Sequence, residues 1–191
     1  LILTLKSLRH LPAMRAFLLA FFFYSMGMQT VMYMATLFGT KELKLETSDL
    51  ILTILLIQLV GIGGAFLFAR LAKIYGNALA ILIALGIWTG VCFAAWFVYT
   101  REEFFMLAIA VGVVMGGTQS LSRSTFALQM PAGSKDTASY FSLLDVSEKM
   151  SIVLGTAAYG IIEAMTGSMR NSVLMLAIFF LIGAGGMLRL Y

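Results

Sequence analysis

Four ionisable side chains lie in two stretches of this sequence that are otherwise mostly apolar. They are Arg123, Asp145, Glu148 and Lys149. They lie in the predicted helices 103–129 and 138–165, which also contain Gln119, Ser120 and Ser122. If these helices cross a membrane, each ionisable group costs about 2.5–3.5 kcal/mol to insert. The usual reason for keeping such groups is a polar pathway or site inside a helix bundle, and we expect one here.

Asp145 and Lys149 are four residues apart, so they share one helix face in the order that favours an ion pair. Two interpretations are open. The pair neutralises itself and makes the helix insertable, or Lys149 faces a cavity as a cationic site or gate for a carboxylate or phosphate. Glu148 points about 100° away from Lys149 around the helix. It therefore either pairs with a group on another helix or titrates as a proton-coupling acid.

Arg123 also has two interpretations. Its side chain extends to the cytoplasmic surface of the membrane, or it forms a salt bridge with Asp145 on the neighbouring helix and gates a pathway. Gln29 and Gln58 lie on two earlier predicted helices. We expect them either to hydrogen-bond a solute or to join neighbouring helices.

Catalytic and metal-binding patterns are not found in the sequence. Ser122 and Ser124 have no histidine at a spacing that suits a serine hydrolase, because His10 is the only histidine. Cys92 is the only cysteine and lies in an apolar run, so neither a disulfide framework nor a cysteine metal site is predicted. We therefore expect no enzymatic activity, no cofactor and no metal.

The composition is that of an integral membrane protein. The 191 residues are 61% hydrophobic and 12% charged, and the mean hydropathy is +0.97. Soluble domains are nearer about 45–50% apolar and 25% charged. The net charge of +4 is spread over predicted helix ends, which indicates contact with a lipid bilayer and not with nucleic acid. Since the sequence begins at Leu1 and has no signal-peptide pattern, we expect a longer native chain.

Six apolar runs are each close to the roughly 20 residues that a membrane-spanning helix needs. They predict an all-α membrane protein whose helices lie at 14–39, 49–71, 77–99, 103–129, 138–165 and 171–190, after a basic interfacial linker at 1–13. Ser48 and Asp49 are expected to cap the second helix, and Asn77 the third. Glycines are expected to bring helices into close contact, in the groups Gly61-Gly63-Gly64, Gly86-Gly90 and Gly112-Gly116-Gly117.

Polar residues are distributed unequally among the six helices. The third and sixth contain no charged residue except Arg189 at the end, so we expect them to face lipid while the others line a cavity. This period of three predicts two three-helix repeats. At about 1.5 Å per residue, four polar side chains lie about 15–18 Å from one surface, near the bilayer midplane. They are Tyr24, Gln58, Gln119 and Lys149. The lysine and arginine bias places both termini in the cytoplasm.

One segment resembles the cytoplasmic loop motif of the major facilitator superfamily. It runs from Gly64 to Asn77 and contains Arg70, with Lys73 where the motif usually has an acid. The resemblance implies that Arg70 contributes to gating.

The chain as a whole is more specifically similar to the second half of a bacterial branch of that superfamily, related to fungal vacuolar amino-acid effluxers. The matching pieces lie between about residues 4 and 190, and the most specific is Gln119-Ser120-Leu121-Ser122-Arg123-Ser124. The others include Phe17 to Ala20, Tyr24, Gly27, Gln29, Thr30, Gln58, Gly61, Pro131, Lys149 and Gly155. Relatives often have an acid near Met26, so coupling here would use Glu148 or Asp145, or be absent.

This resemblance implies the C-terminal half of a twelve-helix secondary transporter in the plasma membrane. An N-terminal half of the same chain would be its partner, and an amino acid or related small solute its substrate. Alternating access would place Tyr24, Gln29, Gln58, Gln119 and Lys149 in the cavity. Arg123, Asp145, Glu148 and Arg70 would serve gating or coupling. Lys149→Ala is then expected to abolish transport. The alternative is a half-size channel or scaffold that pairs as a homodimer.

Overall fold

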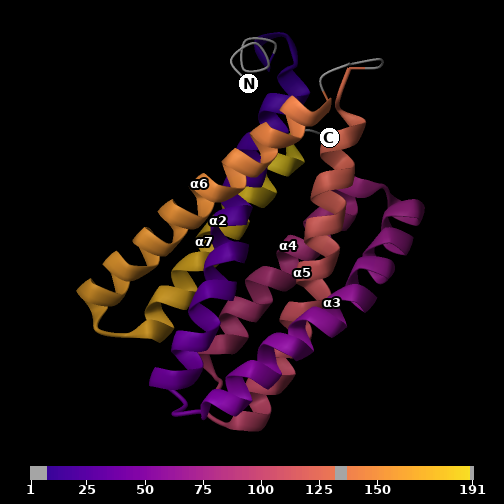
Figure 1. Cartoon of the computed structure of the whole chain (residues 1–191). Coiled ribbons are helices and arrows are strands. Elements are labelled where there is room, and N and C mark those ends of the chain that lie inside the picture. Colours follow the sequence, from indigo (N-terminus) through magenta and orange to yellow (C-terminus); the bar gives the residue numbers. More distant parts are fainter. Residues whose placement is uncertain (1–7, 132–136, 190–191) are drawn as a thin grey trace.

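A computed structural model describes residues 8–131 and 137–189 (Figure 1). In these residues a 3-10 helix, η1 (Leu8–His10), precedes six long helices. These are α2 (Pro12–Lys41), α3 (Thr47–Tyr75), α4 (Asn77–Trp96), α5 (Arg101–Leu128), α6 (Thr137–Thr166) and α7 (Met169–Leu188). The described residues form no strand, so the all-α prediction is confirmed. Helix ends differ from the predicted ones by at most four residues, and part of the predicted linker 1–13 lies outside the described residues.

Several helices begin or end at residues that satisfy the free backbone groups of a helix end or make them unnecessary. Pro12 opens α2, where its missing N–H is not needed, and Gly76 turns the chain between α3 and α4 with a φ of 85° that favours glycine. Thr100 and Glu103 form a reciprocal capping box at the start of α5. Two predicted caps are wrong. Helix α3 starts before Ser48, with Glu46 at its N-cap and no side-chain cap, and Asn77 follows the N-cap of α4.

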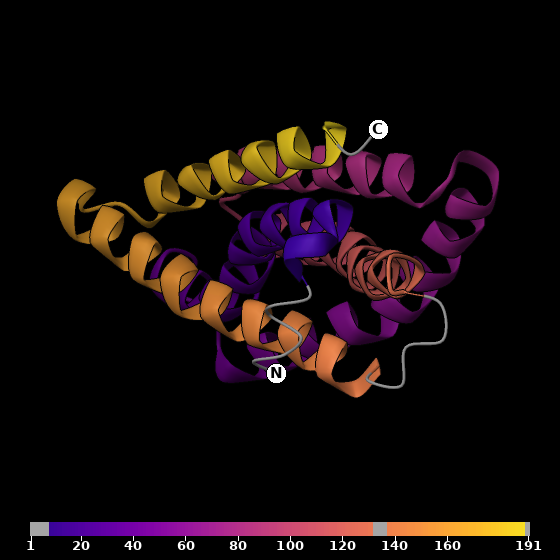
Figure 2. The ribbon, with the colours of Figure 1, turned by 90° about the horizontal axis from the view of Figure 1, so that it is seen from above.

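The six helices form two equivalent groups of three, α2–α4 and α5–α7. The middle helix of each group packs on the first helix of the other, as α3 on α5 and α6 on α2. Likewise the first helix of each packs on the third of the other, as α2 on α7 and α5 on α4. Seen from above, α4 and α7 lie along one side, α2 and α5 are central, and α3 and α6 flank them (Figure 2). This exchange symmetry is the one predicted for two three-helix repeats.

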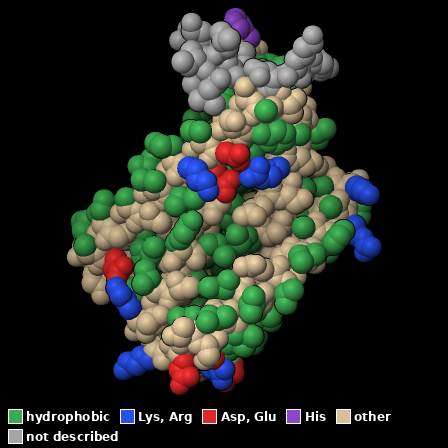
Figure 3. Space-filling view, viewed as in Figure 1, with side chains coloured by type: hydrophobic (Ala, Val, Ile, Leu, Met, Phe, Trp, Pro, Cys, Tyr) green, Lys and Arg blue, Asp and Glu red, His purple; other side chains and the backbone are tan. Residues whose placement is uncertain are grey.

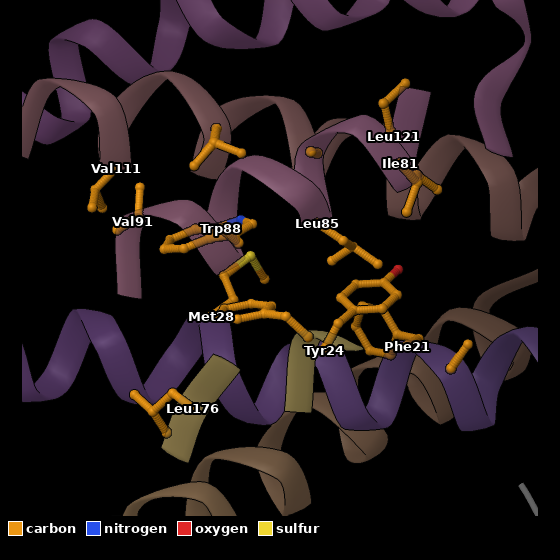
Figure 4. Packing of buried hydrophobic residues seen from close by; sticks show 14 of the residues in the cluster. Phe21, Tyr24, Met28, Ile81, Leu85, Trp88, Val91, Val111, Leu121 and Leu176 are labelled. Carbon is orange, nitrogen blue, oxygen red and sulfur yellow. The ribbon is translucent and has the colours of Figure 1, made fainter. Parts of the chain in front are cut away.

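Aromatic side chains fill the space between α2, α4 and α7. Trp88 and Phe180 stack with ring centroids 5.2 Å apart, and both are fully buried. Tyr24 and Phe21 meet edge to face at 5.4 Å beside Leu85 (Figure 4). Because interiors are close-packed, this core fixes α2 between its two neighbours.

Glycine brings α3 and α5 together more closely than any other residue would allow. A Cβ on Gly116 would overlap the carbonyl of Gly61, and one on Gly64 would overlap the carbonyl of Val113. Gly112 is equally constrained, since its Cβ would lie 2.9 Å from the carbonyl oxygen of Ile57. The packing role predicted for Gly63, Gly86 and Gly90 is wrong for the described residues, because a Cβ at these positions would meet none of their atoms within 4 Å.

Five of the six long helices in the described residues are long and apolar enough to cross a membrane: α2, α3, α4, α5 and α7. The exception is α6, although its 30 residues span about 45 Å. The reason is its composition, since Asp145, Glu148 and Lys149 all fall in its first half. Helix α6 packs mainly on α2 and less on α7, so the one long helix that is not apolar enough to cross a membrane by these criteria lies at a flank of the bundle.

Candidate functional site

Arg123 connects α5 to α6 through two carboxylates. Its Nη2 donates to Asp145 Oδ1 at 3.1 Å and lies 3.5 Å from Glu148 Oε2. The side chains of Arg123 and Asp145 are both 52% exposed, whereas that of Glu148 is 19% exposed. Figure 3 shows a compact group of acidic and basic side chains on this face of the bundle, surrounded by apolar and neutral surface. We call Arg123, Asp145 and Glu148 the charge cluster.

Gln29 on α2 holds the other oxygen of Glu148. Its Nε2 donates to Glu148 Oε1 at 2.6 Å, and Gln29 itself is 7% exposed. One turn further along α6, Ser151 Oγ donates to Ser25 Oγ of α2 at 3.0 Å. Glu148 is therefore shared between α2 and α5, and of the two interpretations from sequence the structure has the one in which it pairs with other helices.

Lys149 is exposed and makes no salt bridge within the described residues. The self-neutralising pair that its spacing from Asp145 suggested is not formed, because Asp145 is bonded to Arg123. A lysine and an aspartate four residues apart on a helix nevertheless remain within reach of each other. Lys149 is thus an unpaired cation beside a cluster that holds two acids and one base.

An open groove of about 550 Å³ lies between α3 and α5 and reaches Arg123. Its polar lining comes from Gln58, Gln119, Ser120 and Arg123. Its apolar lining includes Met32, Ile57, Ile62, Ala65 and Met115, and its floor the glycines Gly61, Gly112 and Gly116. Within the described chain, no partner is found for the amides of Gln58 and Gln119, which leaves their donors and acceptors available to a solute.

A smaller cavity of about 60 Å³ lies on the other side of Arg123, between α2, α5 and α6. It is lined by Phe21, Met28, Gln119, Ser122, Arg123, Leu144 and Glu148. Gln119 and Arg123 line both spaces, so these two side chains separate the groove from the interior of the bundle.

Tyr24 lies beneath the site and not in the groove. It is fully buried, and its hydroxyl is 2.7 Å from Ser122 Oγ. Ser122 donates to the Thr118 carbonyl at 2.6 Å, and the indole of Trp88 donates to Thr118 Oγ1 at 3.1 Å. These bonds form a polar line through α2, α5 and α4, which supports the helices on which the groove residues stand.

Arg70 forms no salt bridge with the residues of the charge cluster. It is exposed near the end of α3 and makes no salt bridge in the part of the chain that the structure describes. Nearby at the same end of the bundle, Asn77 donates to Ser124 Oγ at 3.3 Å and to Thr125 Oγ1 at 3.2 Å, joining α4 to α5. The described residues also contain no group of three metal-ligand side chains.

Comparison with known proteins identifies the family. A family model described as vacuole effluxer Atg22 like matches residues 1–191, the whole chain. The chain belongs to the Atg22-like family. Its relatives include the MFS-type transporter YxiO of Bacillus subtilis (strain 168), 30% identical over 180 residues. They also include autophagy-related protein 22-2 of Penicillium rubens, 34% identical over 190 residues, and autophagy-related protein 22 of Cryptococcus neoformans, 28% identical over 193 residues.

This member of the Atg22-like family corresponds to only part of each relative. The matches cover 94%, 92% and 93% of the chain, but 41%, 31% and 34% of the B. subtilis, P. rubens and C. neoformans proteins. The resemblance to a branch of the major facilitator superfamily related to vacuolar effluxers is therefore confirmed. The six-helix fold agrees with half of such a transporter.

Sequence reasoning missed two features of this Atg22-like chain. The first is the hydrogen bond between Ser25 of α2 and Ser151 of α6. Its only signal in the sequence is that both are small residues one helix turn from Gln29 and Glu148. The second is Arg170, which donates to the backbone carbonyls of Trp96 and Val98. The only sign of this role in the sequence is an arginine at a predicted helix start and an acid, Glu42, in another loop. Many unrelated loops contain the same two residue types.

Proposed function

We propose that the chain is the six-helix part of a secondary transporter that moves an amino acid or related small solute by alternating access. The observation that carries the proposal is the groove in which the amides of Gln58 and Gln119 converge with the guanidinium of Arg123 beside an apolar wall. Amides and a cation suit a carboxylate-bearing solute, and the apolar wall suits its hydrocarbon part. The names of the B. subtilis and fungal relatives support a transporter.

In this mechanism the charge cluster is the gate. Arg123 ties α5 to α6, and Glu148 ties α6 to α2, so these three helices move together while the bonds persist. Alternating access requires such contacts to break and re-form, and a half-exposed salt bridge is weak enough to do so. The remaining proposed residues have different positions: Gln58 and Gln119 line the groove, Lys149 lies beside the cluster, and Tyr24 and Gln29 support it from within.

The groove face is proposed to pack against a second six-helix unit of the same polypeptide. On this face α3 carries exposed apolar side chains together with the polar groove, an arrangement that would be costly against lipid alone. The relatives are long enough to contain a further bundle. Native mass spectrometry of the polypeptide at its native length would return a monomer. A stoichiometric dimer of a chain near 20.8 kDa would instead favour the homodimeric scaffold.

Orientation follows from the charges at the two ends. At the end where α2 begins and α7 finishes, Arg15, Arg70, Lys73 and Arg189 make no salt bridge within the described residues. At the opposite end Lys41, Arg101 and Arg170 each pair with an acid, and Lys44 makes no salt bridge within the described residues. Because lysine and arginine are enriched on the cytoplasmic side of membrane proteins, we propose that both termini lie in the cytoplasm. We further propose that the membrane is the plasma membrane. Cysteines introduced at positions 15 and 44 should react with an impermeant reagent only at position 44 in intact cells.

Uptake into proteoliposomes tests the function. The native polypeptide should accumulate at least one member of a panel of amino acids, and Gln119→Leu should reduce uptake by at least about tenfold, since a lost hydrogen bond to a charged solute group costs about 1.5–3 kcal/mol. Thr156→Val is the matched control, because among the described residues Thr156 bonds only to carbonyls of its own helix. Absence of uptake of the whole panel by the wild type would refute the proposal.

A further inference from the structure

Only one nitrogen of the Arg123 guanidinium contacts the two acids. Asp145 and Glu148 both approach Nη2, and no hydrogen bond of Nη1 or Nε is found within the described residues. A guanidinium carries five N–H donors in a planar fork that accepts a carboxylate through two parallel bonds. Arg123 lines both the groove and the inner cavity and is half exposed. Its unused donors are thus available to an anion that enters the groove.

Charge decides how such an anion binds. Arg123 already faces two carboxylates, so a third negative charge beside it is unfavourable unless one of the two departs. Glu148 is the less mobile of the two, since its second oxygen accepts a 2.6 Å hydrogen bond from Gln29 and its side chain is 19% exposed. Asp145 has Arg123 as its single salt-bridge partner in the described chain and is 52% exposed. Asp145 is therefore the acid that leaves.

Lys149 is a second cation with which Asp145 can pair after it leaves Arg123. Lys149 lies four residues after Asp145 on the same helix, in the order that favours an ion pair, and is exposed and unpaired in the described structure. No residue of another helix has to move for Asp145 to change partners. One rotation of the Asp145 side chain exchanges the interhelical bond to Arg123 for an intrahelical bond to Lys149.

We propose that Arg123 is the receptor for the carboxylate of the solute, that Asp145 is a tethered competitor for it, and that Lys149 holds Asp145 once the solute has displaced it. The inference rests on the proposed function and assigns the polarity of its substrate: a free carboxylate is required. It also links binding to motion. Loss of the Arg123–Asp145 bond removes the more exposed of the two salt bridges between α5 and α6, so solute binding itself loosens the gate.

Isothermal titration of the purified native-length protein with L-methionine and with L-methioninamide tests the inference. The amino acid has a thioether side chain suited to the apolar wall of the groove, and the amide differs from it by lacking the carboxylate. Methionine should bind and methioninamide should not. Arg123→Gln should abolish methionine binding. Asp145→Asn should tighten it about fivefold, because an exposed ion pair is worth up to about 1 kcal/mol.

A double-mutant cycle separates the two roles open to Lys149. If Lys149 acts through Asp145, Lys149→Gln should weaken binding about twofold in the wild type and leave it unchanged in the Asp145→Asn background. Equal weakening in both backgrounds would show that Lys149 contacts the solute directly and would overturn the inference, as would unchanged affinity in Asp145→Asn. Failure of the wild type to bind any amino acid would overturn the proposed function and the inference with it.

Discussion

Two arginines in this bundle have opposite environments. Arg170, at the start of α7, is 14% exposed and donates to the carbonyl oxygens of Trp96 and Val98 at 2.6 and 2.8 Å. Its Nε lies 3.4 Å from Glu42, and its guanidinium lies over the Tyr99 ring at 4.2 Å. Arg123, in the middle of the polar face, is 52% exposed and has only carboxylate partners in the described chain.

The difference shows how a bundle can keep one end fixed and one region mobile. Arg170 satisfies carbonyls at the end of α4 that the helix itself cannot satisfy, and it joins α7, α4 and the end of α2. Removing it leaves buried acceptors without donors. Within the described residues Arg123 satisfies no backbone group, and breaking its half-exposed salt bridges would cost little. We infer that the Arg170 end holds the helices together while the charge cluster rearranges.

The largest predicted effect tests the contrast between Arg170 and Arg123 directly. Arg170→Met should lower the free energy of unfolding by about 3–5 kcal/mol, because it leaves Glu42 and two carbonyls unpaired. Arg123→Met, the matched substitution, should cost no more than about 1 kcal/mol, because its salt bridges are exposed. Thermal unfolding of the purified protein in detergent measures both. Equal losses would mean that Arg123 is as structural as Arg170.

A second prediction concerns the seam between α2 and α6 beside the charge cluster. A Cβ on Gly155 would lie 2.7 Å from the carbonyl oxygen of Met26, so Gly155→Ala should force the helices apart and cost about 1–3 kcal/mol. Gly160, five residues further along α6, is exposed and has no atom within 4 Å of a Cβ. Gly160→Ala should therefore stabilise the helix by up to about 1 kcal/mol. The two variants are expected to shift Tm in opposite directions. A lower Tm in both would contradict close packing of α2 and α6 at Gly155.

Sequence reasoning succeeded where the signal was local or compositional. The hydrophobic runs gave six helices because each run had to cover a bilayer, and the period of three in polar content predicted two repeats. For Arg123 it left two interpretations open, and one of them, the salt bridge with Asp145 on the neighbouring helix, is present in the structure. For Glu148 it left pairing with another helix as one of two alternatives, and the structure has that pairing, with Gln29 and Arg123.

The failures arose where packing between helices decides. Spacing alone favoured Asp145 with Lys149, but Arg123 lies closer to that carboxylate once α5 and α6 meet. Gly63, Gly86 and Gly90 were indistinguishable in sequence from Gly61 and Gly116, because the helix face that contacts a neighbour depends on the rotation of each helix. Tyr24 was assigned to the cavity from its estimated depth alone, but its position around α2 turns it into the core.

A third, smaller prediction sharpens the description of the charge cluster. Gln29→Leu removes the 2.6 Å hydrogen bond to Glu148, and interhelical hydrogen bonds in membranes contribute about 0.6 kcal/mol on average and at most about 1.7. The loss should disappear in a Glu148→Leu background, where the bond no longer exists. Thermal unfolding of the single and double variants measures it. An equal loss in both backgrounds would show that Gln29 stabilises the bundle by packing and not through Glu148.

The smallest effect is expected at the end that Arg170 holds. Lys41 and Glu163 join α2 to α6 at 3.3 Å, but the lysine side chain is 59% exposed and the glutamate 28%. Such pairs contribute about 0–1 kcal/mol, so Lys41→Ala should lower Tm only slightly, and the difference from wild type should vanish at 1 M salt, where the Debye length is about 3 Å. Arg170→Met, measured in parallel, should keep its full effect at high salt because its partners are buried or backbone groups. A salt-insensitive loss in Lys41→Ala would show that the stability of this end is shared between Lys41 and Arg170, and the contrast between a single buried anchor and a mobile cluster would no longer hold.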